Sequence, residues 1–568
     1  MSGRTLRSLL GLLPLLAVSA CVREIPRLIV PPVPIGDGGR LIRELYRSAW
    51  VPPASDDDLI RVALVPGETA VRFRALAPMQ IRAYSESDSW EVASPEGVIW
   101  AVVAGPIVRP PIVAQFATVR QLLLRADESP PQSDLRLWHG RGYSAARWVG
   151  PAALDEKPRA PLERWLLSLA RTSDRESALK LCARAQARFR TACHVEARIE
   201  LPPIVEGTLT AENSNFSKTF RGFLELISPR APVELLGFLP EERTGERSNE
   251  RYGPRLLVVP SVNNTVSLVQ STSLGNYLEG VVPAELFADA PAAALEAQSV
   301  VARTYALRYF KAEETARPYL ICANTNCQVY RGIKYKKSAS STAVASTRNL
   351  VLREPTGGYA ETYYHSICGG HTEPRSAIWG ASDRGYLAGV SDEPEEAPLV
   401  ALWTDADVAT YLDTPATSFC GTASLMKKDR WRWTADFDSQ KLDDLARSLG
   451  LDLPLTAVAV KKRGISGRAL KIEFRNANIS KTVEGELKIR GLFGGLLSSL
   501  FVLEPKIEEE RITALHVRGG GYGHGVGLCQ MGAVGRAERG ERFEKILSDY
   551  YPGTVLGPID PTKGGVVP

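Results

Sequence analysis

The sequence lacks several signatures that would place it at once in a common class of protein. Beyond the first 20 residues, no apolar run is long enough to span a bilayer as a helix. The 568 residues carry a formal net charge of only +5, which is too little to indicate nucleic-acid binding. No Gly-Lys-Ser/Thr phosphate loop and no G-x-S-x-G nucleophile elbow occurs. No repeat of fixed period is visible either.

The N-terminus has the layout of an export signal. Two arginines precede the apolar run Leu9–Val18, which is too short to cross a membrane. The run ends in the letters VSAC, similar to the lipobox of bacterial lipoproteins, which implies cleavage before Cys21 and lipidation of its sulfur. Ordinary signal peptidase cleavage near Ser19 and Ala20, without lipidation, is the alternative. We expect an exported, membrane-anchored chain at the periplasmic face of the envelope, and Val22 suits outer-membrane sorting.

Export affects how the seven cysteines after Cys21 are interpreted. An oxidising compartment permits disulfides, and the odd number leaves at least one thiol. Cys182 and Cys193 lie in one predicted helical region and form a plausible pair. The alternative for the others is zinc, although the Cys-x2-Cys knuckle of common structural sites is absent. The candidate zinc ligands are Cys322, Cys327, His365, Cys368 and His371.

The pattern along the chain predicts an α+β fold with β-rich segments around a central helix. We expect that helix at residues 292–310, preceded by Pro291, and a shorter amphipathic helix at 436–450. Residues 161–193 also predict helices, whereas 203–271 and 455–492 predict strands. The expected divisions are a signal peptide (1–20), a Pro-rich tether (21–57), a β-rich region (58–254) with a helical insert (about 158–200), a larger domain (255–555) and a tail (556–568).

Glu285 is the most informative single residue. It is the only carboxylate between Glu279 and Asp289, and it follows the apolar letters VVPA. A carboxyl group among apolar neighbours resists ionisation, so we expect a raised pKa and the capacity to donate a proton near neutral pH. The alternative is that Glu285 lies in the first turn of a helix, where acids are favoured in any case.

Four segments after residue 270 combine polar side chains with tight turns. They read GVVPAEL with the following helix, CANTNCQVYRG, YHSICGGHTE with a downstream Trp-Gly, and GGGYGHGVGLCQMGA. The glycines of the last segment allow the backbone to approach a ligand or another strand closely. His524 and Gln530 would then present polar groups on a tight scaffold.

Taken in order and spacing, these segments resemble the SpoIID family, which comprises stage II sporulation protein D and related amidase-enhancer proteins. The resemblance also includes RGISGRALKI and ILSDYYPG and covers about residues 255 to 555, which we therefore interpret as a SpoIID-like catalytic domain. The departures are slight: Leu286 stands where Met is usual, and Ser299 takes a position that is often Ala.

The resemblance implies a peptidoglycan lytic transglycosylase in which Glu285 is the essential acid. Such an enzyme cleaves the MurNAc–GlcNAc bond and forms 1,6-anhydroMurNAc, preferably on peptide-stripped glycan. Most glycosidases need two carboxylates, whereas here the substrate's own C6 hydroxyl is the nucleophile. Zinc-containing members use cysteines near the second segment, but no histidine lies between Phe310 and Cys327, so we expect no cofactor.

The remaining motif residues are expected to shape a glycan cleft or to support it, since polar and aromatic groups suit sugar hydroxyls and ring faces. The candidates are Gln298, Arg303, Tyr305, Gln328, Tyr330, His365, Ser366, Thr372, His524 and Gln530. The expected partners are glycan strands, the membrane through the lipid anchor, and a cell-wall amidase. Two other hypotheses remain: a non-catalytic glycan binder that recruits an amidase, and a metal-dependent wall hydrolase.

Overall fold

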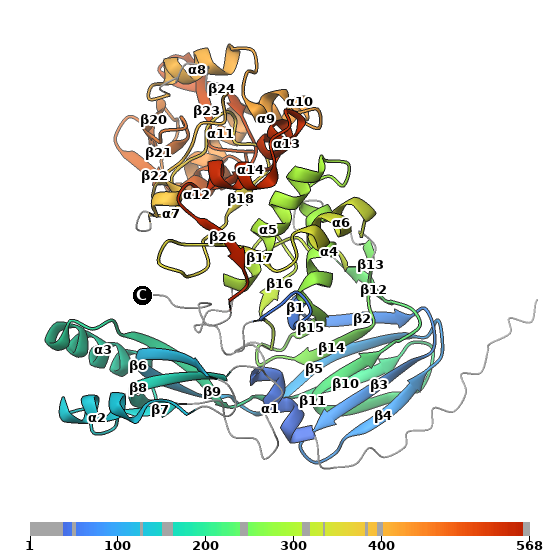
Figure 1. Ribbon diagram of the computed structural model, residues 1–568. Helices are drawn as coiled ribbons and strands as arrows, with labels where there is room; N and C mark the ends of the chain where they lie inside the picture. Colours follow the sequence, from blue (N-terminus) through green and yellow to red (C-terminus); the bar gives the residue numbers. More distant parts are fainter. Residues whose placement is uncertain are drawn as a thin grey trace, which may run out of the picture.

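The computed structural model (Figure 1) describes residues 38–47, 53–124, 129–149, 163–238, 248–308, 318–332, 336–380, 384–394 and 402–560. The predicted signal peptide and the lipidation site Cys21 lie outside these residues. None of the described helices combines the length and apolar character needed to cross a bilayer. The architecture is mixed α+β, as the sequence predicts, with one large sheet and several small ones.

The large sheet has twelve strands and forms the lower part of the molecule in Figure 1. Its strands alternate buried and exposed side chains where one face is solvated, as in β3. Ten strands follow one another in the order β13 (Ser248–Tyr252), β12 (Val233–Phe238), β2 (Ala70–Ala75), β5 (Ile99–Arg109), β10 (Ile204–Ala211), β11 (Ser217–Ile227), β14 (Arg255–Pro260), β15 (Val266–Ser273), β1 (Leu59–Glu68) and β16 (Ile321–Cys322). β3 (Met79–Ser85) pairs with β11 and with β4 (Trp90–Ser94).

This sheet runs across the expected boundary between residues 254 and 255. Leu224 of β11 lies opposite Val258 of β14 in an antiparallel pair, and β14 pairs with β15. β1, from the start of the N-terminal region, pairs with both β15 and β16. The N-terminal region and the first strands of the larger domain therefore share one sheet and one hydrophobic core.

A four-stranded sheet projects from the large one. Its order is β7 (Arg147–Val149), β8 (Glu163–Thr172), β6 (Ile112–Leu124) and β9 (His194–Leu201). α2 (Gln132–Gly140) and α3 (Arg175–Phe189) accompany it, and the predicted disulfide Cys182–Cys193 is present. The prediction of helix throughout 161–193 is wrong for 163–172. A short apolar run does not distinguish buried helix from strand, and β8 pairs on both sides.

The C-terminal half carries short sheets and most of the helices. The sheets are β19 (Arg432–Asp438), β24 (Arg511–Gly520) and β23 (Phe501–Glu508); β20 (Ala457–Arg463), β21 (Ala469–Arg475) and β22 (Ser480–Glu484); β17 (Leu350–Arg353) with β26 (Val555–Pro558); and β18 (Tyr364–His365) with β25 (Leu528–Cys529). The helices are α4 (Leu274–Glu285), α5 (Ala292–Arg308), α6 (Ser338–Ser346), α7 (Arg375–Trp379), the 3-10 helix Gly385–Leu387, α8 (Asp405–Asp413), α9 (Phe419–Thr422), α10 (Lys428–Trp431), α11 (Ser439–Ser448), α12 (Glu486–Leu492), α13 (Gln530–Glu538) and α14 (Phe543–Tyr550).

The predicted central helix is confirmed as α5. It lies against α4, α6, α13, α14 and β17, and its small alanines let these elements approach closely. The prediction of a strand at 484–492 is wrong. Gly485 adopts a φ of +103°, which turns the chain, and Glu486 and Arg490 then pair across one turn of α12.

Residues 38–47, inside the expected tether, form α1 (Gly38–Arg47). Ile42 and Leu45 of this helix are buried against the sheet, together with Phe223 and Val269. This part of the segment is therefore docked on the sheet rather than serving as a free linker, because its apolar side chains cover an otherwise exposed sheet face.

A fully buried ion pair joins the start of the sheet to α5. Arg303 is 0% exposed, and its Nε and Nη2 donate to the two carboxylate oxygens of Asp56 at 2.7 and 2.8 Å. The same guanidinium donates to the backbone carbonyls of Val344 and Leu350. The bidentate geometry and the additional acceptors satisfy a charge that would be costly to bury alone.

We expect Asp56→Ala to lower the free energy of unfolding by about 3–5 kcal/mol, since it leaves the Arg303 guanidinium buried without a counter-charge. The double variant Asp56→Ala with Arg303→Met should recover much of this loss, because it removes both charges. Urea unfolding of wild type and the two variants measures the effect. A double variant as unstable as the single one would contradict the assignment of the loss to an unpaired charge.

Candidate functional site

Glu285 is the last residue of α4. Ser273 caps the beginning of this helix by accepting from the Asn276 N–H, and Pro283 lies in its final turn. The alternative that Glu285 lies in the first turn of a helix is therefore wrong, because α5 begins only at Ala292. The carbonyl groups at a helix C-terminus disfavour a negative charge nearby. The helix dipole therefore does not stabilise the ionised form of this half-buried carboxyl.

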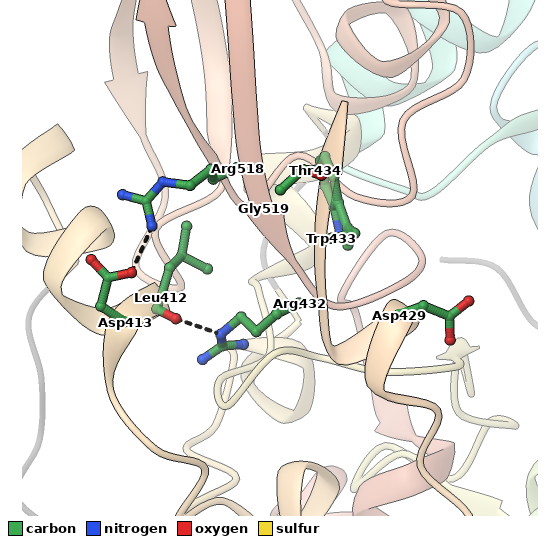
Figure 2. Close-up of a pocket in the computed structure, with 8 residues that line it drawn as sticks. All are labelled: Leu412, Asp413, Asp429, Arg432, Trp433, Thr434, Arg518 and Gly519. Carbon is green, nitrogen blue, oxygen red and sulfur yellow. Dashed lines mark hydrogen bonds and ion pairs between the residues drawn. The ribbon is translucent and has the colours of Figure 1, made fainter. Parts of the chain in front are cut away.

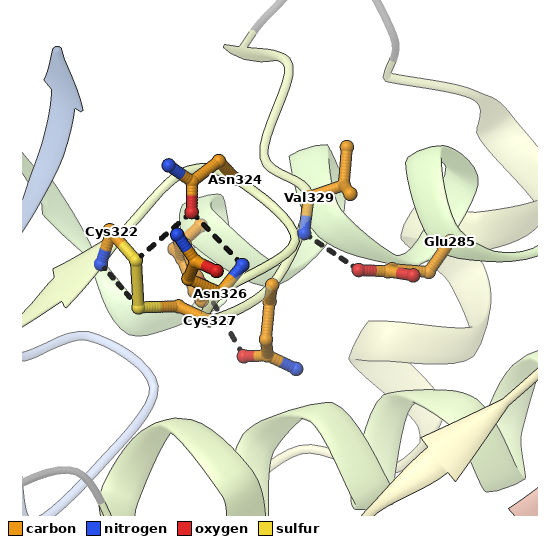
Figure 3. Close-up of a disulfide and its surroundings, with 8 residues drawn as sticks. Glu285, Cys322, Asn324, Asn326, Cys327 and Val329 are labelled. Atoms are coloured by element: carbon orange, nitrogen blue, oxygen red, sulfur yellow. Dashed lines mark hydrogen bonds between the residues drawn. A yellow bond between two sulfur atoms is a disulfide. The ribbon is translucent and has the colours of Figure 1, made fainter. Parts of the chain in front are cut away.

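A loop closed by a disulfide lies beside the Glu285 carboxyl (Figure 3). Cys322 at the end of β16 is bonded to Cys327, and the chain then continues to Val329. The Val329 N–H points at the carboxyl group and donates to Glu285 Oε1 at 2.6 Å. The loop is tied to the sheet because the Ala323 N–H donates to the Ala63 carbonyl. The position of Oε1 therefore depends on the disulfide loop.

Gln530, the first residue of α13, holds the main chain of Glu285. Its Nε2 donates to the Glu285 carbonyl at 2.9 Å and to Gln298 Oε1 at 3.4 Å. The last carbonyls of a helix have no partner within the helix, so this bond satisfies the end of α4. Gln298 and Gln530 are both buried, which makes them supports of Glu285 in this structure.

Hydrogen bonds through the Gln328 amide connect a tyrosine of α4 with a tyrosine of the third motif. Tyr277 donates from its hydroxyl to Gln328 Oε1 at 3.2 Å, and Gln328 Nε2 donates to Tyr364 Oη at 3.3 Å. Burial raises the pKa of Tyr364 well above its ordinary value, and the nearby Glu285 charge raises it further. The ring of Tyr305 lies 6.2 Å from that of Tyr364. Tyr364 is therefore a neutral hydroxyl beside Glu285, and the sequence analysis did not single it out.

His365 and His524 form an aromatic cluster with Trp379. The two imidazole rings are 5.5 Å apart, and His524 lies 5.1 Å from Trp379, which is 45% exposed. Burial lowers the pKa of His365 to about 3, and the pKa of His524 is also well below its usual value, chiefly through burial. Both imidazoles are neutral at pH 7, so neither supplies a proton there.

Arg468, from the RGISGR segment, contacts both the third and the fourth motif. It was not among the predicted site residues. It is 0% exposed and donates to the backbone carbonyls of Cys368 and His371 at 2.8 and 3.2 Å. A side chain on Gly525 would collide with its guanidinium. The charge of Arg468 also contributes, after burial, to the low pKa of His365. Its place in a conspicuous motif was the signal that could have found it.

Several predicted site residues have structural contacts instead. Arg303 is occupied by Asp56, and Thr372 exchanges hydrogen bonds with Val390. Tyr330 is buried and donates to Gln270 Oε1 at 2.9 Å. The Ser366 carbonyl accepts from the Met531 N–H and from the Cys529 thiol. These contacts hold the surrounding elements together.

The predicted zinc ligands are not brought together as a set. Cys322 and Cys327 are consumed by their disulfide, so they cannot serve as thiolate ligands. His365 Nδ1 contacts the Val526 carbonyl, and His371 Nδ1 contacts the Thr372 carbonyl. Cys368 lies instead with two cysteines from outside the predicted set, Cys420 and Cys529.

A pocket of about 490 Å³ lies elsewhere, between α8, α10, β19 and β24 (Figure 2). Arg518 pairs with Asp413 at its rim, and Arg432 donates to the Leu412 carbonyl. Its lining contains neither Glu285 nor any other predicted site residue. This pocket is therefore separate from the candidate site around Glu285.

Gly280→Ala should destabilise the protein by about 1–3 kcal/mol, because overpacking a close contact costs this much. The added Cβ would lie 2.5 Å from the Tyr330 ring and 3.2 Å from the Gly332 carbonyl. Gly491→Ala in α12 is the matched control, since nothing lies within 4 Å of its added Cβ. Thermal unfolding compares the two. Equal unfolding midpoints would contradict the close packing of α4 on the segment that contains Tyr330 and Gly332.

Two family models each match one part of this chain. Residues 262–353 match a family model described as Stage II sporulation protein (SpoIID), and residues 373–527 match a domain of unknown function, DUF8618. The chain is 29% identical over 305 residues to an uncharacterized protein of Brachyspira hyodysenteriae, covering 54% of this chain and 71% of that one.

Two relatives from Bacillus subtilis have informative names. The amidase enhancer is 29% identical over 302 residues, which cover 49% of this chain but only 40% of that protein. Stage II sporulation protein D is 27% identical over 317 residues, covering 53% of this chain and 79% of that one. The SpoIID match contains both Glu285 and the disulfide loop that holds it. The chain thus carries a SpoIID-family domain and is related to the amidase enhancer and to stage II sporulation protein D.

Proposed function

We propose that this chain is a peptidoglycan lytic transglycosylase that cleaves the MurNAc–GlcNAc bond and leaves a 1,6-anhydroMurNAc end. The observation that carries the proposal is the placement of Glu285. Its half-buried carboxyl stands at the end of α4, and Oε1 is fixed by the Val329 N–H. A proton donor needs such a fixed position relative to the bond that breaks.

The mechanism uses the Glu285 carboxyl twice. Because Oε1 accepts from Val329, the proton resides on Oε2 and is donated to the oxygen that leaves C1 of MurNAc. The C1–O bond breaks as the C6 hydroxyl of the same sugar attacks C1. The proton of that hydroxyl passes to Glu285, which restores the acid and closes the 1,6-anhydro ring. The reaction consumes no water, because the nucleophile is a hydroxyl of the substrate itself.

A single carboxylate fits this chemistry better than ordinary hydrolysis. Hydrolytic glycosidases place a second carboxyl to activate water or to attack the sugar. Three other buried carboxylates in the described part of residues 255–555 are engaged in structural contacts. Glu361 pairs with Arg308 and Arg375, Glu373 accepts from the Ser466 and Ile465 backbone, and Asp392 accepts from Tyr550 and Cys420.

The aromatic cluster beside the motifs supports a sugar substrate. Trp379 lies 4.7 Å from Tyr363 and 5.1 Å from His524, and nearly half of its surface is exposed. Exposed aromatic faces pack well against sugar rings, while the neutral imidazole of His524 can hydrogen-bond to hydroxyls. We therefore place the glycan strand along Trp379 and Tyr364, preferably after its peptides have been removed.

The proposed place of action is the cell envelope. Two disulfides fit an oxidising compartment outside the cytoplasm. We propose export as a lipoprotein, with Cys21 lipidated and the chain anchored to a membrane on its periplasmic face. Peptidoglycan would then be both substrate and binding partner.

A second candidate function is the recruitment or stimulation of a cell-wall amidase by a glycan-binding protein that does not cleave. The similarity to a protein named amidase enhancer favours it. The presence of a positioned carboxyl at Glu285 favours catalysis.

Glu285→Gln should lower the rate of glycan cleavage by about 10²–10⁴-fold, the usual contribution of a positioned acid–base group. Glu279→Gln is the matched control: it lies one and a half turns earlier in α4 and pairs with Lys336 at the surface. The purified full chain and both variants are incubated with peptide-free glycan strands and with intact peptidoglycan, and mass spectrometry reads the products.

Anhydro-muramic ends from wild type and from Glu279→Gln, but not from Glu285→Gln, are the expected result. Reducing ends would contradict the proposed reaction, because they require water as the nucleophile. Strand binding without cleavage in all three proteins would favour the amidase-recruiting alternative.

A further inference from the structure

Four side chains that could ligate a metal meet in the C-terminal half, away from Glu285. Cys368, Asp392, Cys420 and Cys529 are all 0% exposed, and their ligand atoms lie within 4.8 Å of one another. They come from four separate segments: Cys368 from the third motif, Asp392 from residues 384–394, Cys420 from α9, and Cys529 from the end of β25 just before α13. We propose that these four residues bind one zinc ion in a closed structural site. The inference does not depend on the proposed catalytic function.

The distances suit a tetrahedral ion. Zinc with Zn–S bonds of about 2.3 Å and a Zn–O bond of about 2.0 Å places its ligand atoms about 3.5–3.8 Å apart. Cys368 Sγ lies 3.4 Å from Cys420 Sγ and 3.4 Å from Asp392 Oδ2. Small adjustments of side-chain torsions would therefore bring the cluster to the ideal separations. Three thiolates and one carboxylate are a donor set that suits zinc.

Backbone donors are already oriented toward the sulfurs. The Cys368 and Gly532 N–H groups donate to Cys529 Sγ at 3.1 and 3.3 Å, and the Gly370 N–H donates to Cys368 Sγ at 3.3 Å. A neutral thiol is a weak acceptor, whereas a metal-bound thiolate is a good one. Cys529 also caps the beginning of α13, where a negative sulfur is favoured.

The carboxylate ligand has its own support. Tyr550 donates from its hydroxyl to Asp392 Oδ1, which leaves Oδ2 directed toward the thiols, and Arg536 Nε lies 3.9 Å from Oδ1. A Cβ on Gly532 would lie 2.5 Å from Asp392 Oδ1, so the backbone is packed closely around this group. Such outer contacts orient metal ligands, and Arg536 offsets part of the negative charge of a site with four anionic ligands.

The alternative is a disulfide between Cys368 and Cys420. It would leave Asp392 Oδ2 facing sulfur atoms, with the Arg536 charge on the side of Oδ1. It would also leave Cys529 as a thiol with two N–H donors directed at its sulfur. A zinc ion accounts for all four side chains at once. Because all four ligands come from the protein, the site has no open position for substrate, and its role is to fasten the motif segments. Cys529 directly precedes Gln530, so the ion would also steady the contact of Gln530 with Glu285.

The test measures zinc in the full chain purified without chelator, by inductively coupled plasma mass spectrometry. We expect one zinc ion per chain in wild type and almost none in Cys420→Ser. The control Cys182→Ser with Cys193→Ser removes two cysteines from the separate four-stranded sheet and should keep the zinc. Tyr550→Phe, which retains all four ligands, should weaken zinc binding about 10- to 100-fold in competition with a chromophoric chelator.

Cobalt exchanged into the wild-type chain gives a second readout that does not rely on variants. Thiolate-to-cobalt charge-transfer bands with intense tetrahedral d–d bands are expected. A chain without stoichiometric zinc, in which peptide mapping without reduction finds Cys368 bonded to Cys420, would overturn the proposal. Zinc retained in Cys420→Ser would also overturn it.

Discussion

The end of helix α4 is fixed by two hydrogen bonds from distant parts of the chain, and the arrangement of the site depends on them. Val329 donates to the Glu285 carboxyl, and Gln530 donates to the Glu285 carbonyl. The first donor lies 44 residues away in the sequence and the second 245. The first bond requires the segment after the disulfide loop to be in place and the second requires α13, so the position of the acid depends on segments far apart in the sequence.

Most of the conspicuous motif residues support the site from a distance. Arg468 fastens the backbone of the third motif, Arg303 joins α5 to the first strand region, and Gln298 and Gln530 hold the end of α4. Buried polar groups of this kind must find partners, which restricts them to one arrangement. This explains why these segments carry buried polar side chains as well as tight turns.

The elements that local pattern determines could be predicted, and the contacts that connect distant segments could not. The alanine-rich pattern predicted a helix at residues 292–310, and α5 begins at the same residue and ends two residues earlier. The apolar neighbours of Glu285 identified it as the candidate acid. The sequence left Arg303 as either a cleft residue or a structural support, because its partner Asp56 is 247 residues away. Asp392 and Cys420 carry no motif of their own, so only the folded chain brings them beside Cys368 and Cys529.

Cleavage of glycan strands in water enriched in oxygen-18 tests the central claim most directly. If Glu285 serves alone and the C6 hydroxyl closes onto C1, the new muramic ends carry no heavy oxygen. Heavy oxygen at C1 would show that water is the nucleophile, and it would contradict a site built around a single carboxylate.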